Sequence, residues 1–250
     1  MMKRMIKMVL TMTLTAAPFY AQAQLAVSAA PRDIASRAIN VMAGSAWEKA
    51  RYFSFSFNVE RDGKIAASFP QRWDRFTGDY RVSGKDREGH DFDIRMNLNT
   101  RQGTAVLDGK PVADAQKLLE RGYGRFINDT WWLLMPIKLL DPGTKLENAG
   151  VRQDECGLAH DVLKLTFDQG VGLTSRDQYW VWISRDTGLV DRWEMLLQDS
   201  KDERPTVVFL REYGRYAGLL LSTLKEEDNG IKIRLADLVV STEVPAGAFK

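Results

Sequence analysis

The sequence predicts a mainly β protein with added helices, built as a curved antiparallel meander of about eleven strands that forms a half-barrel. An N-terminal helix and inserted helices are expected to lid its open side. Three observations predict this fold. Short runs with alternating apolar and polar residues fill most of the chain, turn sequences such as Asp62-Gly63 separate them, and two apolar helical stretches could cover a concave face.

The first residues have the layout of a secretory signal peptide. Three basic residues open the chain: Lys3, Arg4 and Lys7. The run Met8–Ala21 is mostly apolar but too short to span a bilayer, and Ala21-Gln22-Ala23 provides small residues for cleavage. We therefore predict that residues 1–23 are a cleaved signal peptide and that residues 24–250 form a single half-barrel domain.

Charge and cysteine content narrow the function classes. Loss of three basic residues changes the formal net charge from +2 to −1, which argues against a nucleic-acid-binding protein. The chain has a single cysteine, Cys156, so an intramolecular disulfide and a CxxC site are excluded. Cys156 lies far from the cleavage point and is not a lipid-bearing residue. We expect a periplasmic monomer without a membrane anchor, a metal or a cofactor.

The N-terminal half is predicted as one helix followed by a meander. Apolar residues recur with helical spacing from Pro31, with Asp33 as a candidate N-cap, and we expect the helix to end near Gly44. Beyond it, Phe53, Phe55 and Phe57 alternate with polar residues, as in a half-buried strand. The expected strands are 53–59, 64–69, 71–76, 80–85, 92–98 and 104–107.

A helical insert is predicted in the middle of the chain. Val112–Gly122 has helical spacing, and the apolar segment around Trp131–Leu140 follows it. Pro136 would disrupt a helix interior, so we expect it to open a short helical turn. The second half then returns to strands, with Asp228-Asn229-Gly230 as one hairpin turn. These strands are expected at 163–167, 179–183, 189–197, 206–210, 216–224 and 231–240.

Two motifs and the C-terminal tail carry a resemblance to a known family. The motifs are Asp129–Asp141, with Trp131-Trp132 inside it, and Tyr179–Trp193; the tail is Asp237–Phe249, with Val244-Pro245 before its final Phe249. With the order of helix, meander, insert and meander, the chain resembles a secreted member of the LolA/LolB-like superfamily of periplasmic lipoprotein carriers and receptors. The resemblance implies an incomplete barrel whose helices lid a hydrophobic cavity. It also implies an arginine early in the sheet that holds the lid closed, for which Arg72, Arg75 and Arg81 are alternative candidates.

Large apolar residues are the candidate cavity wall. Five consecutive ones, from Trp131 to Met135, cannot all face one core from a single element, so they either plug the sheet or also line a ligand cavity. Tryptophans at 180 and 182 share a strand face, with a third tryptophan across the hairpin, and these either pack the core or floor a lipid pocket. The candidates are Trp131, Trp132, Leu134, Met135, Trp180, Trp182, Trp193, Phe92, Ile94 and Met96.

Catalytic and metal-binding interpretations are weak. His90 and His160 each precede an aspartate, but neighbouring strand residues point to opposite faces, and we expect both histidines in solvated turns. Cys156 lies in a polar loop beside acidic residues and has no clear histidine partner, so it is a poor candidate nucleophile. A hydrolase would need two of three carboxylates to converge in a cleft; these are Asp91, Asp93 and Asp129.

Three functions follow in order of preference. The first is non-enzymatic binding of a lipid, an acyl chain or a lipoprotein's acyl groups, with a role in outer-membrane lipoprotein sorting. A filled, dry concave face with no cavity would overturn it. The second is an envelope protein that has a solidly packed sheet, takes no ligand and binds a protein partner through its surface. The third is the hydrolase.

Overall fold

The structure is a computed structural model that describes residues 29–201 and 203–250. The predicted signal peptide lies outside the described residues. The strands form a 13-stranded sheet in the order β6-β5-β4-β3-β2-β1-β13-β12-β11-β10-β9-β8-β7. Each strand is antiparallel to its neighbours, and β6 and β7 lie at the two edges, so the sheet stays open.

The first half of the chain forms six successive strands. They are β1 (Tyr52–Arg61), β2 (Lys64–Asp74), β3 (Asp79–Lys85), β4 (Asp91–Asn97), β5 (Gly103–Leu107) and β6 (Lys110–Pro111). The second half forms seven more. They are β7 (Thr144–Gln153), β8 (Ala159–Phe167), β9 (Gln178–Ser184), β10 (Val190–Leu196), β11 (Thr206–Tyr216), β12 (Leu219–Glu227) and β13 (Lys232–Ser241). Pairing of β1 with β13 joins the two halves.

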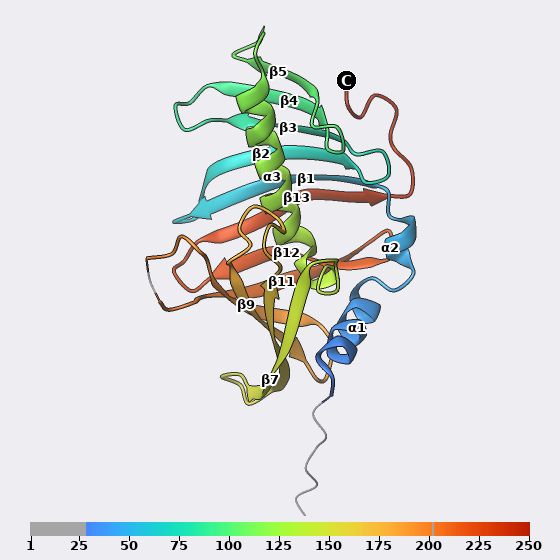
Figure 1. The fold of residues 1–250 in the computed structure, drawn as a ribbon, viewed down its shortest axis with the longest axis vertical. Coiled ribbons are helices and arrows are strands. Elements are labelled where there is room, and N and C mark those ends of the chain that lie inside the picture. The colour runs from blue at the N-terminus through green and yellow to red at the C-terminus, as the bar shows by residue number, and fades with distance from the viewer. Residues whose placement is uncertain (1–28, 202) are drawn as a thin grey trace, which may run out of the picture.

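Helices cover one face of this sheet, which we call the inner face. They are α1 (Pro31–Met42), α2 (Ala46–Lys49), α3 (Gln116–Leu134) and the 3-10 turn η1 (Met135–Ile137). Figure 1 shows α3 crossing in front of the sheet from β5 to β12. Helix α1 lies near the other end and contacts η1, β7 and β12. The opposite face is the outer face.

The core lies between these helices and the inner face. Along β1, the phenylalanines predicted to alternate with polar residues are at most 3 % exposed and belong to the core: Phe53, Phe55 and Phe57. Ser54 and Ser56, between them, are only half-buried. The period of two in the sequence therefore sets which side chains meet the helices.

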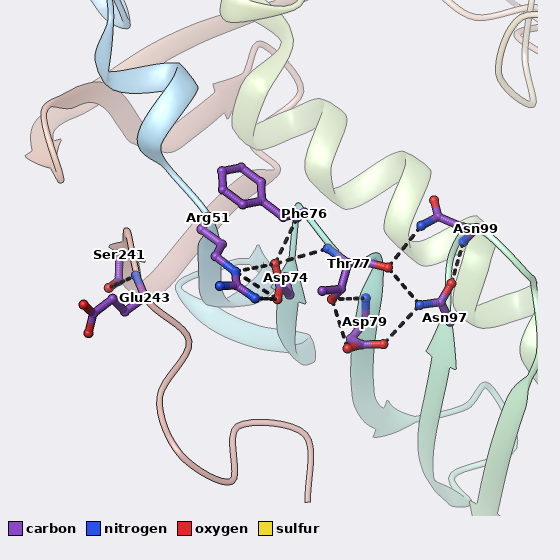
Figure 2. Close-up of polar contacts among 9 residues, drawn as sticks. All are labelled: Arg51, Asp74, Phe76, Thr77, Asp79, Asn97, Asn99, Ser241 and Glu243. Atoms are coloured by element: carbon purple, nitrogen blue, oxygen red, sulfur yellow. Dashed lines mark hydrogen bonds and ion pairs between the residues drawn. The ribbon is translucent and has the colours of Figure 1, made fainter.

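Asp74 fixes the turn between β2 and β3 (Figure 2). Its carboxylate accepts hydrogen bonds from the Phe76 backbone N–H at 2.9 Å and from Arg51 Nη2 at 2.8 Å. Burial acts to raise the pKa of Asp74, but the hydrogen bonds from Arg51 and the turn backbone outweigh it and lower the pKa. Since Arg51 follows α2, this ion pair ties the N-terminal helices to the end of the sheet.

The predicted fold class is confirmed, with differences in detail. The strand count is thirteen rather than about eleven, because β6 has only two residues and β7 lacks clear alternation. Strand β2 is continuous through Pro70, which was expected to separate two strands. It can remain continuous because β3 pairs only with Gln71–Trp73, so the missing Pro70 N–H breaks no bond on that side.

Helix α3 is longer than predicted and absorbs the first part of the tryptophan-rich segment. Pro136 does open a short helical turn, as expected, because it lies in η1 directly after α3. Within the described residues, we find no helix with the length and apolarity needed to cross a membrane.

Candidate functional site

The interface between α3 and the inner face is the candidate functional site. Near its start the helix approaches β4 so closely that a Cβ added at Gly122 would lie 2.9 Å from Ile94 Cγ2. Near its end the Trp132 ring lies 5.4 Å, centroid to centroid, from Trp193 of β10. One helix thus spans the inner face from the first half of the sheet to the second.

A buried polar cluster joins the middle of α3 to the sheet. Asp129, which has no exposed surface, accepts hydrogen bonds from Gln71 of β2 and from Arg125 one helical turn earlier. Asn128 donates to the same carboxylate at 2.8 Å. The Tyr80 hydroxyl of β3 donates to Gln71 Oε1 at 2.7 Å, so the amide links helix and sheet. We call Gln71, Tyr80, Arg125 and Asp129 the lid cluster.

Burial controls the ionisation of this cluster. It raises the pKa of Asp129, although Arg125, Asn128 and Gln71 act to lower it. Burial together with the negative charge of Asp129 raises the pKa of Tyr80 well above its ordinary value. The Arg125 guanidinium also lies over the ring of Phe69, 4.0 Å from its centroid. The helix is therefore held by charge-assisted hydrogen bonds inside an apolar layer.

Most predicted cavity residues do meet at this interface. Leu134 and Met135 are buried in the core, and Trp131 and Trp132 are half-buried against it. Trp131 lies 5.5 Å from Tyr179, measured between ring centroids. Phe92, Ile94, Met96 and Trp193 are also core residues. Whether any of them contacts a ligand stays a prediction.

The expected grouping of three tryptophans is wrong. Trp193 pairs in register with Val181, a core residue, and therefore faces inward. Trp180 and Trp182 alternate with Val181 and face the outer side, where Lys164 lies over Trp180 and Arg192 over Trp182. A bulge between Val190 and Arg192 shifts the hairpin register, which is not apparent from the sequence.

None of the three candidate arginines has a hydrogen bond to α3 among the described residues. Arg72 and Arg81 face outward and donate to the backbone oxygens of Ala248 and Lys250 in the C-terminal tail. Arg75 donates to the carbonyl of Ala50, at the end of α2, at 2.8 Å. Polar contacts that hold α3 come instead from the lid cluster, whose arginine lies on the helix itself, and from Arg121 of α3, whose Nη1 lies 3.7 Å from Asp86 Oδ2. The sequence signal that could have indicated the lid cluster was Gln71, a polar residue in an apolar strand pattern.

The predicted solvation of His160 is also wrong. Its ring is buried, with Nε2 3.0 Å from Asp191 Oδ2 and Nδ1 2.9 Å from the carbonyl of Leu158. His90 is exposed, as expected. The lone Cys156 is also exposed.

The three carboxylates of the hydrolase hypothesis do not converge. Asp91 pairs with Lys85 and Asp93 with Arg81, whereas Asp129 lies on α3 and contacts Gln71 of β2. Residues 29–201 and 203–250 contain no group of three or more His, Cys, Asp or Glu residues placed to hold a metal ion.

Two hollows of the described structure are small. One of about 240 Å³ lies on the outer side and is lined by Ser54, Ser56, Arg72, Arg81, Ser83 and Asp237, among others. The other, of about 170 Å³, lies beside α3 between Met96, Leu119 and Tyr123. Both are smaller than the roughly 300–1,000 Å³ of typical ligand pockets. With α3 in place, the hollow beside it is too small for a ligand of typical size.

Sequence reasoning missed one charged residue of the inner face. Lys225 of β12 pairs in register with Leu210 and Ile233, both core residues, so its side chain faces the helices. It is 1 % exposed, and its Nζ donates to the backbone carbonyl of Ser222 at 2.6 Å. Burial lowers the pKa of Lys225 to about 7. The signal was a lysine at a core position of the alternating strand pattern.

Comparison with known proteins agrees with this fold. A LolA superfamily protein from Nitrosomonas europaea, NE2245, is similar over 89 % of this chain and 98 % of its own, with a TM-score of 0.51 and 10 % identity. A DUF1329 family protein from Desulfovibrio piger is similar over 88 % of this chain and 97 % of its own, with a TM-score of 0.49 and 14 % identity.

No family model and no curated protein matches the sequence. The class that the architecture defines is an open antiparallel meander covered by an N-terminal helix and an inserted helix. The resemblance to the LolA/LolB-like fold expected from the sequence is confirmed over most of the chain at the level of the fold.

Proposed function

We propose that the protein binds the acyl chains of a lipid or lipoprotein between α3 and the inner face, without catalysis, in the periplasm. The observation that carries the proposal is one helix covering an apolar face that spans both halves of the sheet. Displacing such a helix would expose a continuous apolar surface, which suits a ligand that needs few polar contacts. The similarity to a LolA superfamily fold supports it.

Binding requires α3 to move, because the hollow of about 170 Å³ beside the helix is smaller than a typical ligand pocket. Two glycines in the first half of the helix, Gly122 and Gly124, lower its intrinsic stability by about 1 kcal/mol each relative to alanine. Gln71 links the buried Asp129 of α3 to the sheet, and a partly exposed ion pair joins Arg121 of α3 to Asp86 after β3 at 3.7 Å. Rearrangement of these two contacts would release the lid. An export signal at residues 1–23 would deliver the protein to the envelope.

The first test is native mass spectrometry of the mature protein purified from the envelope of the cell that makes it. We expect a bound mass that disappears on organic extraction and matches a lipid or a lipoprotein. Titration with methyl oleate, a neutral acyl compound, should then restore a bound mass. An unliganded mass that methyl oleate does not change would contradict the proposal.

A matched pair of tryptophan variants locates the site. Trp132 and Trp180 are both half-buried but lie on opposite sides of the sheet. We expect Trp132→Ala to change methyl oleate affinity and Trp180→Ala to leave it unchanged, with melting temperatures recorded for both variants. Equal effects of the two substitutions would place the acyl chain elsewhere.

The second candidate is an envelope interaction protein that takes no ligand. The dense packing favours it, since core residues such as Leu134, Met135 and Trp193 are at most 1 % exposed. It predicts an unliganded mass together with a protein partner that is recovered by crosslinking in cells and lost when an outer-face residue such as Trp180 is replaced.

A further inference from the structure

Lys225 places a buried amine in an otherwise apolar row of the inner face. Successive strands place Val59, Ile233, Lys225 and Leu210 side by side in register. The three neighbours are apolar, and Leu210 and Ile233 are 3 % and 5 % exposed. A charge removed from water in this way is strongly destabilising unless it is paired.

The protein partner that the structure gives this amine is a single carbonyl. A protonated lysine can donate three hydrogen bonds, and Lys225 makes one, to Ser222. No carboxylate lies within ion-pair distance of Lys225 among the residues that the structure describes. Glu227, two residues along the same face, contacts Asn229 instead. The buried amine therefore has donor capacity without an acceptor.

The surrounding inner face has a second unmatched donor. The indole N–H of Trp193 is buried and has no hydrogen-bond partner within the described part of the chain. Trp193 pairs with Val208 of β11, two residues from Leu210 in the lysine row. Helix α3 covers this region, since Trp132 lies on Trp193 and the helix contacts β12. Two donors without acceptors under one lid indicate a ligand that supplies acceptors.

We propose that Lys225 binds the anionic headgroup of a single-chain acyl ligand whose chain lies along the inner face under α3. This inference rests on the proposed function and narrows its ligand class. The anion is a carboxylate, as in a fatty acid, or a phosphate, as in a lysophospholipid. Pairing it with Lys225 would satisfy the amine in a dry site, where charge-assisted hydrogen bonds are strong. The apolar neighbours in the row would contact the acyl chain.

The test compares three oleoyl ligands on the full mature protein at pH 7: oleate, 1-oleoyl lysophosphatidic acid and methyl oleate. We expect at least one anionic ligand to bind about tenfold or more tightly than methyl oleate, as one good charged contact would give. A preference for oleate alone identifies a carboxylate ligand, and one for the lysophospholipid alone identifies a phosphate ligand. Either result supports the anchor.

Two lysine variants separate this anchor from general attraction of anions. Lys225→Met replaces the buried amine with an apolar side chain, and Lys164→Met removes an amine that lies over Trp180 on the outer side. We expect Lys225→Met to bind the three ligands alike and Lys164→Met to retain the wild-type preference. Lys225→Met needs no new partner in the core, so it should fold.

The outcomes distinguish the two proposals. Equal binding of all three ligands by the wild type overturns the lysine anchor and leaves acyl binding standing. Retention of the anionic preference by Lys225→Met also overturns the anchor. If none of the three ligands binds to the wild-type protein, the proposed acyl-binding function and the anchor both fail.

Discussion

Two buried ionisable groups lie at the interface between α3 and the inner face in very different surroundings. On the sheet-facing side of α3, Asp129 is surrounded by Arg125, Asn128 and Gln71, each of which donates a hydrogen bond to it. On β12, which α3 also contacts, Lys225 has one carbonyl as its partner. The protein supplies hydrogen-bond donors to the Asp129 carboxylate, whereas it supplies the Lys225 amine with a single acceptor.

This difference assigns different roles to the two regions. A buried charge with a complete set of partners rigidifies its surroundings, which suits the fixed point of a lid. A buried charge with spare donors lowers stability and is expected where a ligand completes the contacts. The lid cluster would therefore hold α3 in place, and the lysine region would take part in what the lid covers. Substitutions in the two regions test this division.

Removal of the Asp129 carboxylate should be the most destabilising single change. Asp129→Ala leaves Arg125 and the Gln71 amide without their acceptor in a buried site. We expect a loss of about 3 kcal/mol or more in the free energy of unfolding. Urea denaturation followed by fluorescence measures it.

An exposed ion pair provides the control for this change. Lys85 and Asp91 are 65 % and 69 % exposed at their side chains, so Asp91→Ala should change stability by less than about 0.5 kcal/mol. A similar loss in both variants would show that Asp129 is not a special fixed point of the lid.

The sequence predicted the strands better than it predicted these charges. Alternation along 53–59 and 92–98 reports directly which side chains face the core, and the structure confirms it for Phe57 and Ile94. Strand β7 was missed because its exposed edge position needs no regular apolar pattern. Gln71, a partner of Asp129, lies 58 residues from it along the chain, and no local sequence pattern specifies such a contact.

Lys225 should make stability rise with pH above neutrality. Its pKa is about 7 in the folded protein, against an ordinary value of 10.5, so the unfolded chain binds more protons between these values. Unfolding free energy should therefore rise by up to about 1.4 kcal/mol per pH unit from this group. Urea denaturation of the wild type and Lys225→Met at pH 7, 8 and 9 gives the slope as their difference.

Other groups in this range change stability in the opposite direction. The hydrogen bond to Asp108 raises the pKa of His90, so its contribution is lost as pH rises through that value. Burial raises the pKa of Tyr80, which favours the unfolded state only above about pH 10. Both effects are shared by the two proteins and cancel. An identical slope in Lys225→Met would show that the lysine titrates normally.

Two glycines of α3 should respond in opposite directions to substitution. A Cβ at Gly122 would meet Ile94 at 2.9 Å, whereas at Gly124 the nearest atom is 3.9 Å away, in Leu173. We expect Gly122→Leu to destabilise the protein by about 1–3 kcal/mol through overpacking. Gly124→Ala should stabilise it by up to about 1 kcal/mol through helix propensity. Thermal unfolding of both variants checks the pair, and a loss in each would indicate that the helix needs glycine at both positions.

The sequence predicted the parts of the site that follow from apolar content. It did not predict the parts that follow from the register between paired strands. Trp131 and Met135 were found because their segment is too apolar for one buried face. Trp182 and Trp193 lie on opposite faces of the sheet because of a bulge after Val190. A bulge changes which face the following side chains lie on, and no residue type at this hairpin indicates it. The lid arginine was sought in the sheet because the family resemblance implied it there, whereas the structure places Arg125 on the helix.

Substitution of Arg72 is expected to have a small effect and tests whether the lid and the C-terminal tail are separate. Its Nη1 donates to the Ala248 carbonyl at 2.9 Å, and the Phe249 ring lies 6.3 Å from that of Tyr52. Arg72→Ala should cost less than about 1 kcal/mol, since a partly exposed hydrogen bond is lost while the ring contact remains. Hydrogen exchange should accelerate in residues 243–250 and stay unchanged in α3. Faster exchange in α3 would mean that this arginine also holds the lid through the sheet, and the division between an outer tail and an inner lid cluster would have to be abandoned.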